Sequence, residues 1–379
     1  MKKIIAIIFI TIILVITIIQ ALAKPPGNPR PTLTPLSQTL PKHIIGFLPY
    51  WQIEQIKNAT FPLLDEIIYF GLHLTEEGRL NKEDAGFRRL QSKTFADIES
   101  ANGKDKISIA IILQDNEAIE IFLANSSARK QATGEILSLI ETYGLGGINL
   151  DFEYSGIPGK ETVQHYNTFI ADLTRDVKKT YPTVSVSVDI TADAVQKSRL
   201  YDVGTLASIV DYVILMGYDF YRPSSSVAGP VAPLSGKEIY EYDVTTAVAD
   251  FLTHVPSRKL ILGVPYYGWD FPTVDDTRGS FVAKRPNEAV ALATYKRMQK
   301  LLEDKQGELR FDKESQTSWL VYKDSASGGT RQIWFEDEAS LGKKYDLINK
   351  ENLAGVAIWA LGYNGEYMEL ETLLQEKFR

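Results

Sequence analysis

Residues 144–154 have the sequence Gly144-Leu145-Gly146-Gly147-Ile148-Asn149-Leu150-Asp151-Phe152-Glu153-Tyr154, in which a glycine-rich entry precedes strict alternation of apolar and polar residues. Side chains two residues apart on a strand share a face. Asn149, Asp151 and Glu153 are therefore expected on one face, and the apolar residues between them on the other. The stretch predicts a buried strand that carries three polar groups and ends in a carboxylate.

Seven other short runs rich in Ile, Val, Leu, Tyr and Phe accompany the strand predicted at Gly147–Phe152. They are His43–Leu48, Glu66–Leu74, Lys106–Leu113, Val184–Ile190, Val210–Met216, Leu260–Tyr266 and Gly355–Leu361. Segments with helical spacing of apolar residues lie between most of these runs. Eight strands that alternate with helices predict an α/β fold, and a (β/α)8 TIM barrel more than an open doubly wound sheet.

The interval between the seventh and eighth runs is too long for a single helix. It contains a segment with helical character around Asn287–Leu302. Three short strands are expected after it, at Leu309–Phe311, Trp319–Tyr322 and Gln332–Phe335. We therefore expect a small α+β insertion over about residues 270–333, between strands seven and eight of the barrel.

Composition excludes several classes of function. The 379 residues include 41 Lys plus Arg and 48 Asp plus Glu, so the formal net charge is −7 and a basic footprint for nucleic acid is lacking. The absence of cysteine rules out disulfides, thiolate metal sites and a thiol nucleophile. The four histidines form no H-E-x-x-H pair, and no G-x-S-x-G elbow exists. The sequence implies no metal and no organic cofactor.

The N-terminal 23 residues have the features of a secretory signal peptide. Lys2 and Lys3 precede a mainly apolar run from Ile4 to Ile19, and Ala21-Leu22-Ala23 resembles a cleavage site. The alternative is an uncleaved membrane anchor, since 20 residues from Ile4 to Ala23 are about enough to span a bilayer. The two lysines favour a cytoplasmic N-terminus in both cases, which places the bulk of the chain outside the cell.

Residues 24–42 separate this segment from the main domain, which is expected over residues 43–379. Six of the 17 prolines lie in this short stretch. Proline-rich segments are extended and semi-rigid, so the stretch is predicted to be a linker that holds the domain away from a membrane or cell wall. We expect an extracellular monomer, either secreted or tethered to the membrane.

Asp151 and Glu153 form a like-charge pair at the end of the predicted fourth strand. Confinement of two carboxyls raises the pKa of one of them and keeps a proton available near neutral pH. Barrel enzymes keep their catalytic residues at the C-terminal strand ends, so Glu153 is the better-placed acid. A D-x-E pair in this position can instead cap the next helix, and the pair alone does not decide between the two interpretations.

Four further motifs follow the expected strand order of one known family. They are Gly46-Phe47-Leu48-Pro49-Tyr50-Trp51, Met216-Gly217-Tyr218-Asp219-Phe220, Gly263-Val264-Pro265-Tyr266-Tyr267-Gly268 and Gly355-Val356-Ala357-Ile358-Trp359. With the fourth-strand carboxylates, which resemble a D-x-x-D-x-D-x-E signature, they make the chain similar to glycoside hydrolase family 18, the chitinase-like barrels. The resemblance spans nearly the whole domain and implies a glycosidase on a TIM barrel.

The chain departs from that signature at two positions. Gly146 and Asn149 stand where the family has Asp, whereas Asp151 and Glu153 are retained. Asn in this position, like the segment Tyr267-Gly268-Trp269-Asp270, also resembles the branch of the family that acts on bacterial peptidoglycan, including spore-cortex hydrolases. Because Asn149 is neutral, we expect that it does not raise the pKa of Asp151 as a second carboxylate would.

The resemblance implies a retaining, substrate-assisted mechanism. Glu153 would protonate the glycosidic oxygen, Asp151 would orient the acetamido group of the substrate, and Tyr218 would bind its oxygen, with Asn149 beside them in the catalytic set. Trp359 would stack against the sugar. The other groove residues would be Asp219 as a polar contact, Met216 in the floor, and Tyr50, Trp51, Tyr267 and Trp269 as aromatic lining. Such aromatics are core or rim packing about as often as ligand platforms.

The sequence therefore favours hydrolysis of β-1,4-linked N-acetylglucosamine polymers, either chitin and its oligosaccharides or the glycan strands of peptidoglycan. A non-catalytic, lectin-like protein on the same barrel is one alternative, which loss of Glu153 would have favoured. An endo-β-N-acetylglucosaminidase that acts on N-glycans is another, because it shares the acetamido chemistry. In each case a polysaccharide or oligosaccharide is the expected partner.

Overall fold

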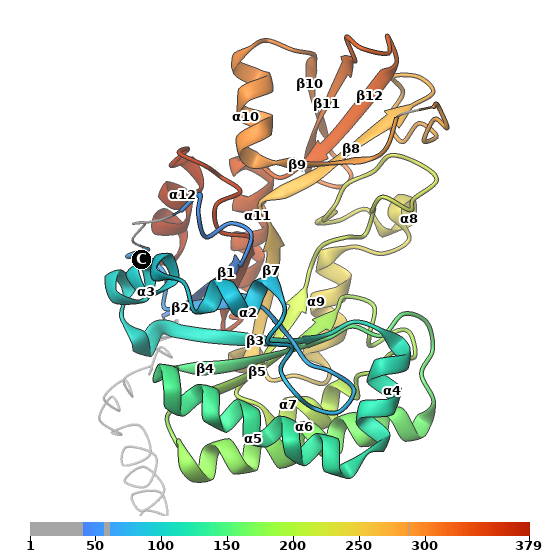
Figure 1. Ribbon diagram of the computed structural model, residues 1–379. Coiled ribbons are helices and arrows are strands. Elements are labelled where there is room, and N and C mark those ends of the chain that lie inside the picture. Colours follow the sequence, from blue (N-terminus) through green and yellow to red (C-terminus); the bar gives the residue numbers. More distant parts are fainter. Residues whose placement is uncertain (1–40, 57–60, 287) are drawn as a thin grey trace, which may run out of the picture. The chain divides into compact units, whose positions relative to one another are not determined.

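The computed structural model of the protein describes residues 41–56, 61–286 and 288–379 (Figure 1). The predicted signal or anchor segment lies outside the described residues, as does nearly all of the predicted linker. Within the described ranges, no helix combines the length and the apolar character needed to cross a membrane.

Eight parallel strands close into a barrel in the order β1-β13-β7-β6-β5-β4-β3-β2 (Figure 1). Their bounds are β1 His43–Pro49, β2 Glu66–His73, β3 Ile107–Leu113, β4 Gly147–Phe152, β5 Ser185–Thr191, β6 Tyr212–Met216, β7 Leu260–Pro265 and β13 Gly355–Trp359. Each strand falls on one of the eight runs expected from the sequence. The predicted (β/α)8 barrel is therefore confirmed.

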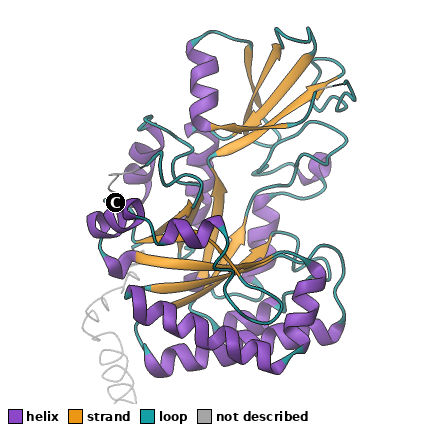
Figure 2. Ribbon diagram, viewed as in Figure 1, coloured by secondary structure: helices purple, strands orange, loops and turns teal. Residues whose placement is uncertain are grey.

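Helices follow most of the barrel strands and surround the barrel (Figure 2). They are α2 Ala85–Leu90, α3 Lys93–Asn102, α4 Asn116–Ala124, α5 Ser126–Tyr143, α6 Lys160–Thr180, α7 Val203–Ile209, α8 Lys237–Tyr240, α9 Val244–Leu252, α11 Glu338–Lys350 and α12 Glu369–Phe378, with 3-10 turns at Lys104–Lys106 and Ser257–Lys259. Helix α6 shows why they form, because its buried residues Tyr166, Phe169, Ile170 and Leu173 recur at helical spacing. This apolar stripe packs toward the barrel.

The glycine-rich entry to β4 meets two separate backbone requirements. Gly144 ends α5 in the left-handed conformation, with φ of 64°, which glycine adopts without steric cost. Gly147 begins β4 where a Cβ atom would lie 2.2 Å from Ser185 Oγ and 2.4 Å from Ser108 Oγ. Glycine at this position leaves room for the side chains of Ser108 on β3 and Ser185 on β5.

The barrel interior is divided into an apolar and a polar part. The apolar cluster is contributed by β1, β2, β3, β6, β7 and β13 and consists of Ile45, Phe47, Ile68, Phe70, Ala110, Ile112, Ile214, Ile261 and Ala357. Strands β4 and β5 instead direct buried Asn149, Asp151, Ser187 and Asp189 away from the main apolar core. Buried polar groups of this kind are costly unless they are hydrogen-bonded or used, so this side of the barrel positions the site.

A five-stranded antiparallel sheet is inserted between β7 and β13, in the order β10-β11-β12-β8-β9 (Figure 2). Its elements are β8 Tyr267–Thr273, β9 Ala291–Thr294, α10 Tyr295–Glu303, β10 Glu308–Asp312, β11 Thr317–Lys323 and β12 Thr330–Phe335. The three strands expected late in this interval coincide with β10, β11 and β12. A single residue, Tyr266, separates the end of β7 from the start of β8, so a residue at the start of β8 can lie at the barrel mouth.

The helix expected around Asn287–Leu302 is wrong in its first half. Residues 291–294 instead form β9, which pairs with the segment Tyr267–Asp270 of β8. Helix α10 begins only at Tyr295, where the Thr294 side chain accepts a hydrogen bond from the amide of Arg297. This N-cap separates strand from helix, and a helical pattern over the whole segment obscured it.

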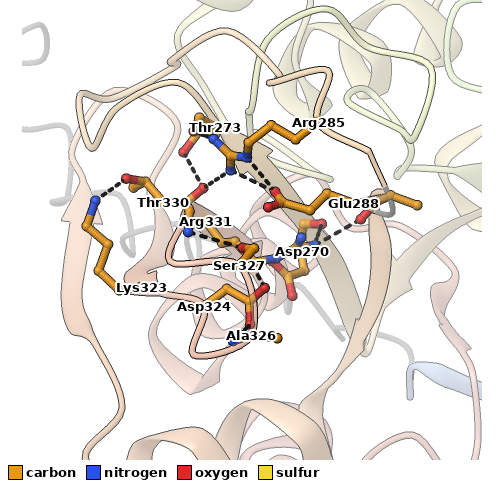
Figure 3. Close-up of polar contacts among 12 residues, drawn as sticks. Asp270, Thr273, Arg285, Glu288, Lys323, Asp324, Ala326, Ser327, Thr330 and Arg331 are labelled. Atoms are coloured by element: carbon orange, nitrogen blue, oxygen red, sulfur yellow. Dashed lines mark hydrogen bonds and ion pairs between the residues drawn. The ribbon is translucent and has the colours of Figure 1, made fainter.

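A network of polar side chains holds the far end of the inserted sheet (Figure 3). Arg285 donates to the carbonyls of Thr273 and Thr330, and to Glu288 at 2.8 Å. Arg331 donates 2.8 Å to the buried Asp270. These contacts brace the polar turn at residues 324–329 between β11 and β12. The role of this network is therefore structural, namely to support the hairpin of β11 and β12.

Candidate active site

Strand β4 delivers the polar face that the sequence predicts. Asn149 and Asp151 are fully or almost fully buried inside the barrel, while Ile148, Leu150 and Phe152 pack into the surrounding apolar core. Glu153 follows the last residue of β4, and its amide still donates to the carbonyl of Leu113 on β3. The carboxyl of Glu153 is thus held at the C-terminal strand end, half-buried.

A cavity of about 370 Å³, here called the site cavity, lies at the C-terminal ends of the barrel strands. The residues predicted for the site that line it are Tyr50, Trp51, Asp151, Glu153, Met216, Tyr218, Asp219, Tyr267 and Trp359. Asn149 and Trp269 are the two predicted site residues that do not line it. Four residues that the sequence did not single out also line the cavity: Phe70, His73, Gln114 and Asp189.

The surroundings of Glu153 shift the pKa of its carboxyl. Gln114, just after β3, donates a 2.6 Å hydrogen bond from Nε2 to Glu153 Oε1. Burial raises the pKa of Glu153 and the carboxyl of Asp219 adds to this, while the hydrogen bond from Gln114 and the charge of Arg222 lower it. The net shift is upward, so Glu153 holds its proton to higher pH than an exposed glutamic acid.

Asp151 lies deeper than Glu153, with 3% of its surface exposed. Its Oδ1 atom has no hydrogen-bond partner among the described residues. Burial raises the pKa of Asp151 well above its ordinary range, and the nearby carboxyls of Glu153 and Asp189 raise it further. Three carboxyls therefore share one poorly solvated space, and their protons leave in steps that belong to the group.

Asn149 is held through both hydrogens of its side-chain amide. Nδ2 donates to Asp189 Oδ1 at 2.8 Å and to Ser187 Oγ at 3.1 Å, both on β5. Asn149 itself does not raise the pKa of Asp151, as expected for a neutral side chain. A second carboxylate nevertheless does so, because Asp189 stands on the neighbouring strand.

Asp219 lies directly after the Met216-Gly217-Tyr218 segment in a left-handed backbone conformation, with φ of 58°. Its Oδ1 accepts hydrogen bonds from Tyr267 Oη at 2.6 Å and from Trp269 Nε1 at 3.0 Å. Burial raises the pKa of Asp219, and these two donors act against that rise. Two of the predicted aromatics therefore bind Asp219 from the start of β8.

An aromatic wall closes the opposite side of the site cavity. The ring of Trp359, at the end of β13, packs edge-on against Phe70 with centroids 4.7 Å apart, and it also contacts Phe47 and Trp51. Trp51 is 44% exposed and packs edge-on against Tyr50. Flat, partly exposed rings beside polar groups provide faces on which a sugar ring can stack.

A second cavity of about 330 Å³, here called the side cavity, shares Glu153, Met216, Tyr218 and Asp219 with the site cavity. Beyond these residues it is lined by the basic side chains of Lys197, Arg199 and Arg222, the acidic side chains of Asp193 and Glu241, and several aromatic rings. The two cavities are therefore neighbours, with Glu153 in the lining of both.

Asp189, Gln114 and Arg222 are the residues that sequence reasoning missed. The alternation of Ser185, Ser187 and Asp189 on β5 is the signal that would have found Asp189, since it repeats the polar face of β4. Gln114 and Arg222 lie outside the strands, and no spacing indicates them. Within the described residues, no group of three or more His, Asp or Glu side chains could hold a metal ion.

A closed (β/α)8 barrel that gathers carboxyls and aromatic rings at its C-terminal strand ends has the architecture of the barrel enzymes. The sequence of residues 43–364 matches the model of the glycosyl hydrolases of family 18, and the chain belongs to this family. The similarity inferred from five motifs is thereby confirmed over most of the chain.

Cortical fragment-lytic enzymes of two Bacillus species are among the proteins to which the chain is similar. A cortical fragment-lytic enzyme of Bacillus subtilis is 28% identical over 255 residues, which cover 65% of this chain and 53% of that protein. A cortical fragment-lytic enzyme of Bacillus anthracis is 25% identical over 329 residues, 82% of this chain and 68% of that protein. The match thus spans about half the length of the Bacillus subtilis enzyme.

Solved structures show the same fold. The class V chitinase of Nicotiana tobaccum superposes with a TM-score of 0.75 at 17% identity, over 89% of this chain and 99% of that chain. At this identity the likeness bears on the fold alone. It agrees with the closed barrel and the described order of elements.

Proposed function

We propose that the protein is a retaining glycoside hydrolase of β-1,4-linked N-acetylglucosamine polymers, with catalysis assisted by the 2-acetamido group of the substrate. The observation that carries the proposal is the position of Glu153, which stands at the mouth of the barrel with its pKa raised and Asp151 buried beside it. Membership of family 18 supports the reaction class.

Glu153 is assigned the role of general acid and base. It transfers its proton to the glycosidic oxygen as the bond from that oxygen to the anomeric carbon breaks. The acetamido carbonyl oxygen of the substrate forms a bond to the anomeric carbon on the opposite face, giving an oxazolinium ion. Glu153, now a carboxylate, accepts a proton from the water that opens this ion, which restores the acid and gives net retention.

Asp151 and Tyr218 are assigned to the acetamido group. The oxazolinium ion carries a positive charge, and an ionised Asp151 below it would stabilise that charge and orient the N–H. Tyr218 is partly buried, and desolvation together with the surrounding carboxyls raises its pKa well above the ordinary value. It therefore stays a hydroxyl and can donate to the acetamido oxygen.

The aromatic residues are assigned to sugar binding. Trp359 and the exposed ring of Trp51 offer faces for stacking, with Tyr50 and Met216 beside them in the lining of the site cavity. Tyr267 and Trp269 act through Asp219, which they hold in place. A sugar chain bound in the site cavity could extend toward the side cavity, which shares four of its lining residues.

The side cavity favours a glycan that carries carboxylates, and thus peptidoglycan over chitin. Lys197 and Arg199 both pair with Asp193, at 3.1 and 2.5 Å. The guanidinium of Arg222 makes no ion pair or side-chain hydrogen bond within the described residues, although it lies near Glu153 and Asp219. An unpaired arginine is suited to bind a carboxylate of a muramic acid unit or its peptide. The Bacillus relatives named as cortical fragment-lytic enzymes point the same way.

The N-terminal sequence adds a proposal about location. A signal or anchor segment over residues 1–23, followed by a proline-rich stretch, suits an enzyme that acts outside the cytoplasmic membrane. A tethered enzyme would reach polymers of the cell's own envelope, which again agrees with a peptidoglycan substrate.

The test is hydrolysis by the full-length protein of chitohexaose, purified peptidoglycan and N-glycans, with the anomer of the product observed by NMR. We expect the β-anomer to appear first, and the preferred polymer identifies the substrate. Glu153→Gln should lower turnover by about 10² to 10⁴ while sugar binding survives. The matched control is Glu161→Gln, which removes the charge of an exposed glutamate in the first turn of α6. Binding without hydrolysis of any of the three glycans would instead favour the lectin-like alternative.

A further inference from the structure

A β-bulge near the end of β2 changes the face on which the last residue of this strand lies. The pairing register between β2 and β3 shifts between Phe70 and Leu72, so that Phe70 lies opposite Ala110 and His73 opposite Ile112. Phe70, Ala110 and Ile112 all belong to the apolar cluster inside the barrel. In a regular strand a residue three positions after Phe70 would point to the opposite face. The bulge instead turns His73 to the inner face, where it lines the site cavity.

Two glycines let the start of α2 pack directly on this bulge. A Cβ atom at Gly86 would lie 1.7 Å from the carbonyl oxygen of Gly71, the residue at which the register shifts. The hydroxyl of Tyr69 also donates a 2.6 Å hydrogen bond to the carbonyl of Gly86. This close approach brings Asp84, which immediately precedes α2, within reach of His73.

Asp84 binds His73 instead of capping its own helix. An aspartate at the N-cap normally accepts a hydrogen bond from an amide in the first turn. The N-cap aspartates of α4, α7, α9 and α11 all accept such a bond, whereas the side chain of Asp84 does not. Its Oδ2 atom lies 2.5 Å from Nδ1 of His73. The carboxylate therefore serves to orient the imidazole ring and not to stabilise α2.

The contact with Asp84 also determines what the other ring nitrogen of His73 can do. An ionised carboxylate only accepts hydrogen bonds, so Nδ1 carries the hydrogen. In the neutral ring Nε2 is then an acceptor with a free lone pair. Within the described residues Nε2 makes no hydrogen bond, and the His73 side chain is 39% exposed. His73 thus offers an oriented acceptor to a ligand in the site cavity.

The acceptor and the aromatic wall occupy the same part of the cavity lining. Phe70, which shares the inner face of β2 with His73, packs edge-on against Trp359 with centroids 4.7 Å apart. Trp51 contacts both of these rings. Stacking binds the face of a sugar ring but leaves the ring free to rotate, whereas a directed hydrogen bond fixes its orientation. Sugar hydroxyls are donors that suit Nε2.

We propose that His73 is a glycan-binding residue, whose Nε2 accepts a hydrogen bond from a hydroxyl of the sugar in the site cavity. Asp84 is a positioning residue that holds the ring in this orientation. The inference rests on the proposed function for the identity of the ligand, a polymer that contains N-acetylglucosamine. The contact itself can be tested without turnover.

Ring nitrogen signals in NMR spectra of the full-length Glu153→Gln protein, labelled with 15N-histidine, test the contact. The signals absent from Glu153→Gln/His73→Gln belong to His73. We expect the tautomer with hydrogen on Nδ1 in the absence of a glycan. Chitohexaose or soluble glycan strands of peptidoglycan should then shift the Nε2 signal, while the signals of His43, His165 and His254 stay in place.

The NMR result and the hydrolysis assay separate this inference from the proposed function. Hydrolysis by the wild type together with an Nε2 signal that neither glycan shifts would overturn the inference and leave the proposed function standing. A shifted Nε2 signal without hydrolysis would support the inference and contradict only the proposed reaction. A hydrogen on Nε2 instead of Nδ1 in the free protein would also overturn the inference.

Kinetics separate a binding role from structural support. His73→Ala should raise KM about fivefold, as expected for the loss of one hydrogen bond, with little change in kcat. Asp84→Ala should also raise KM, and His73→Ala/Asp84→Ala should be no worse than His73→Ala, because Asp84 acts through His73. His254→Ala, which replaces an exposed histidine after α9, is the matched control and should leave KM unchanged. If Asp84→Ala lowered stability but left KM unchanged, or if the two losses multiplied in the double variant, the proposal would be wrong.

Discussion

The hydroxyl of Tyr267 donates a 2.6 Å hydrogen bond to Asp219 Oδ1, which joins the first residue of the inserted sheet to the segment after β6. Trp269, two residues further along β8, donates to the same oxygen at 3.0 Å. Asp219 has a left-handed backbone conformation, and these two donors favour the charged form of its carboxyl. The inserted sheet therefore contributes directly to the organisation of the site.

Tyr267→Phe should weaken this link without removing the ring. The pKa of Asp219 should rise further, because the carboxylate loses its shortest donor, and stability should fall by about 1–3 kcal/mol, the usual cost of removing a partner from a buried polar group. We expect kcat/KM to fall several-fold. Denaturant unfolding and steady-state kinetics measure the two effects.

Tyr154→Phe is the matched control for that variant. It removes a tyrosine-to-carboxylate hydrogen bond to Glu120 that lies on the surface. Its effect on stability should stay below about 0.5 kcal/mol. If Tyr267→Phe changed stability and activity no more than this control, the contact with Asp219 would contribute to neither.

Gln114→Met should shift the pH dependence of the reaction. The hydrogen bond from Gln114 favours the charged form of Glu153 and lowers its pKa, so its loss raises the pKa. Glu153 is then protonated to higher pH, and the alkaline limb of the kcat/KM profile should move upward by about one pH unit. Gln131→Met, which removes a surface contact with Glu135, should leave the limb in place. A downward shift would show that Glu153 is not the acid.

Stability should fall with rising pH because of Asp189. The pKa of this residue is raised to about 8 in the folded state, whereas an unfolded aspartic acid loses its proton near pH 4. Between these values the folded protein binds more protons than the unfolded chain, so the free energy of unfolding decreases as the pH rises. This contribution is absent in Asp189→Asn. The free energy of unfolding of the variant should therefore rise relative to that of the wild type by up to about 1.4 kcal/mol per pH unit across this window. Urea unfolding at pH 5, 7 and 8.5 measures the difference, and parallel curves would contradict the raised pKa.

The barrel was predictable because its strands are apolar runs of ordinary length. On β4 the apolar and polar residues alternate without exception, and burial of Ile148, Leu150 and Phe152 then required Asn149, Asp151 and Glu153 to point inward. The inserted strand β8 was not predicted, since Gly268 and Pro272 interrupt its pattern. A Cβ atom at position 268 would meet the backbone of β12, so the close approach of β8 and β12 requires glycine there. Pro272 lies opposite Arg331 of β12.

The part of the site that the sequence did not indicate depends on contacts between separate strands and loops. Asp189 becomes important only when β5 is placed next to β4 and Asn149 donates to it. Nothing in the local sequence distinguishes Gln114 from other polar residues. It contacts Glu153 because it follows the last residue of β3. Trp269 was expected to line the groove, and its position against Asp219 follows from the direction of β8. Pairing of this kind is a tertiary property, which local patterns do not contain.

Arg222→Gln should separate the two substrate classes. If Arg222 binds a carboxylate of the glycan, its loss lowers kcat/KM on peptidoglycan but not on chitohexaose, which has no carboxylate. Because the side chain is exposed, the effect should be about threefold, typical of a solvent-screened ion pair, and should shrink as salt is raised. Loss of the arginine also raises the pKa of Glu153 slightly, but that change acts on both substrates and cancels in their ratio. Arg258→Gln, an exposed arginine next to the first residues of β7 at the opposite end of the barrel, is the matched control. Equal losses on both glycans would remove the argument for an anionic substrate and leave chitin as the better candidate.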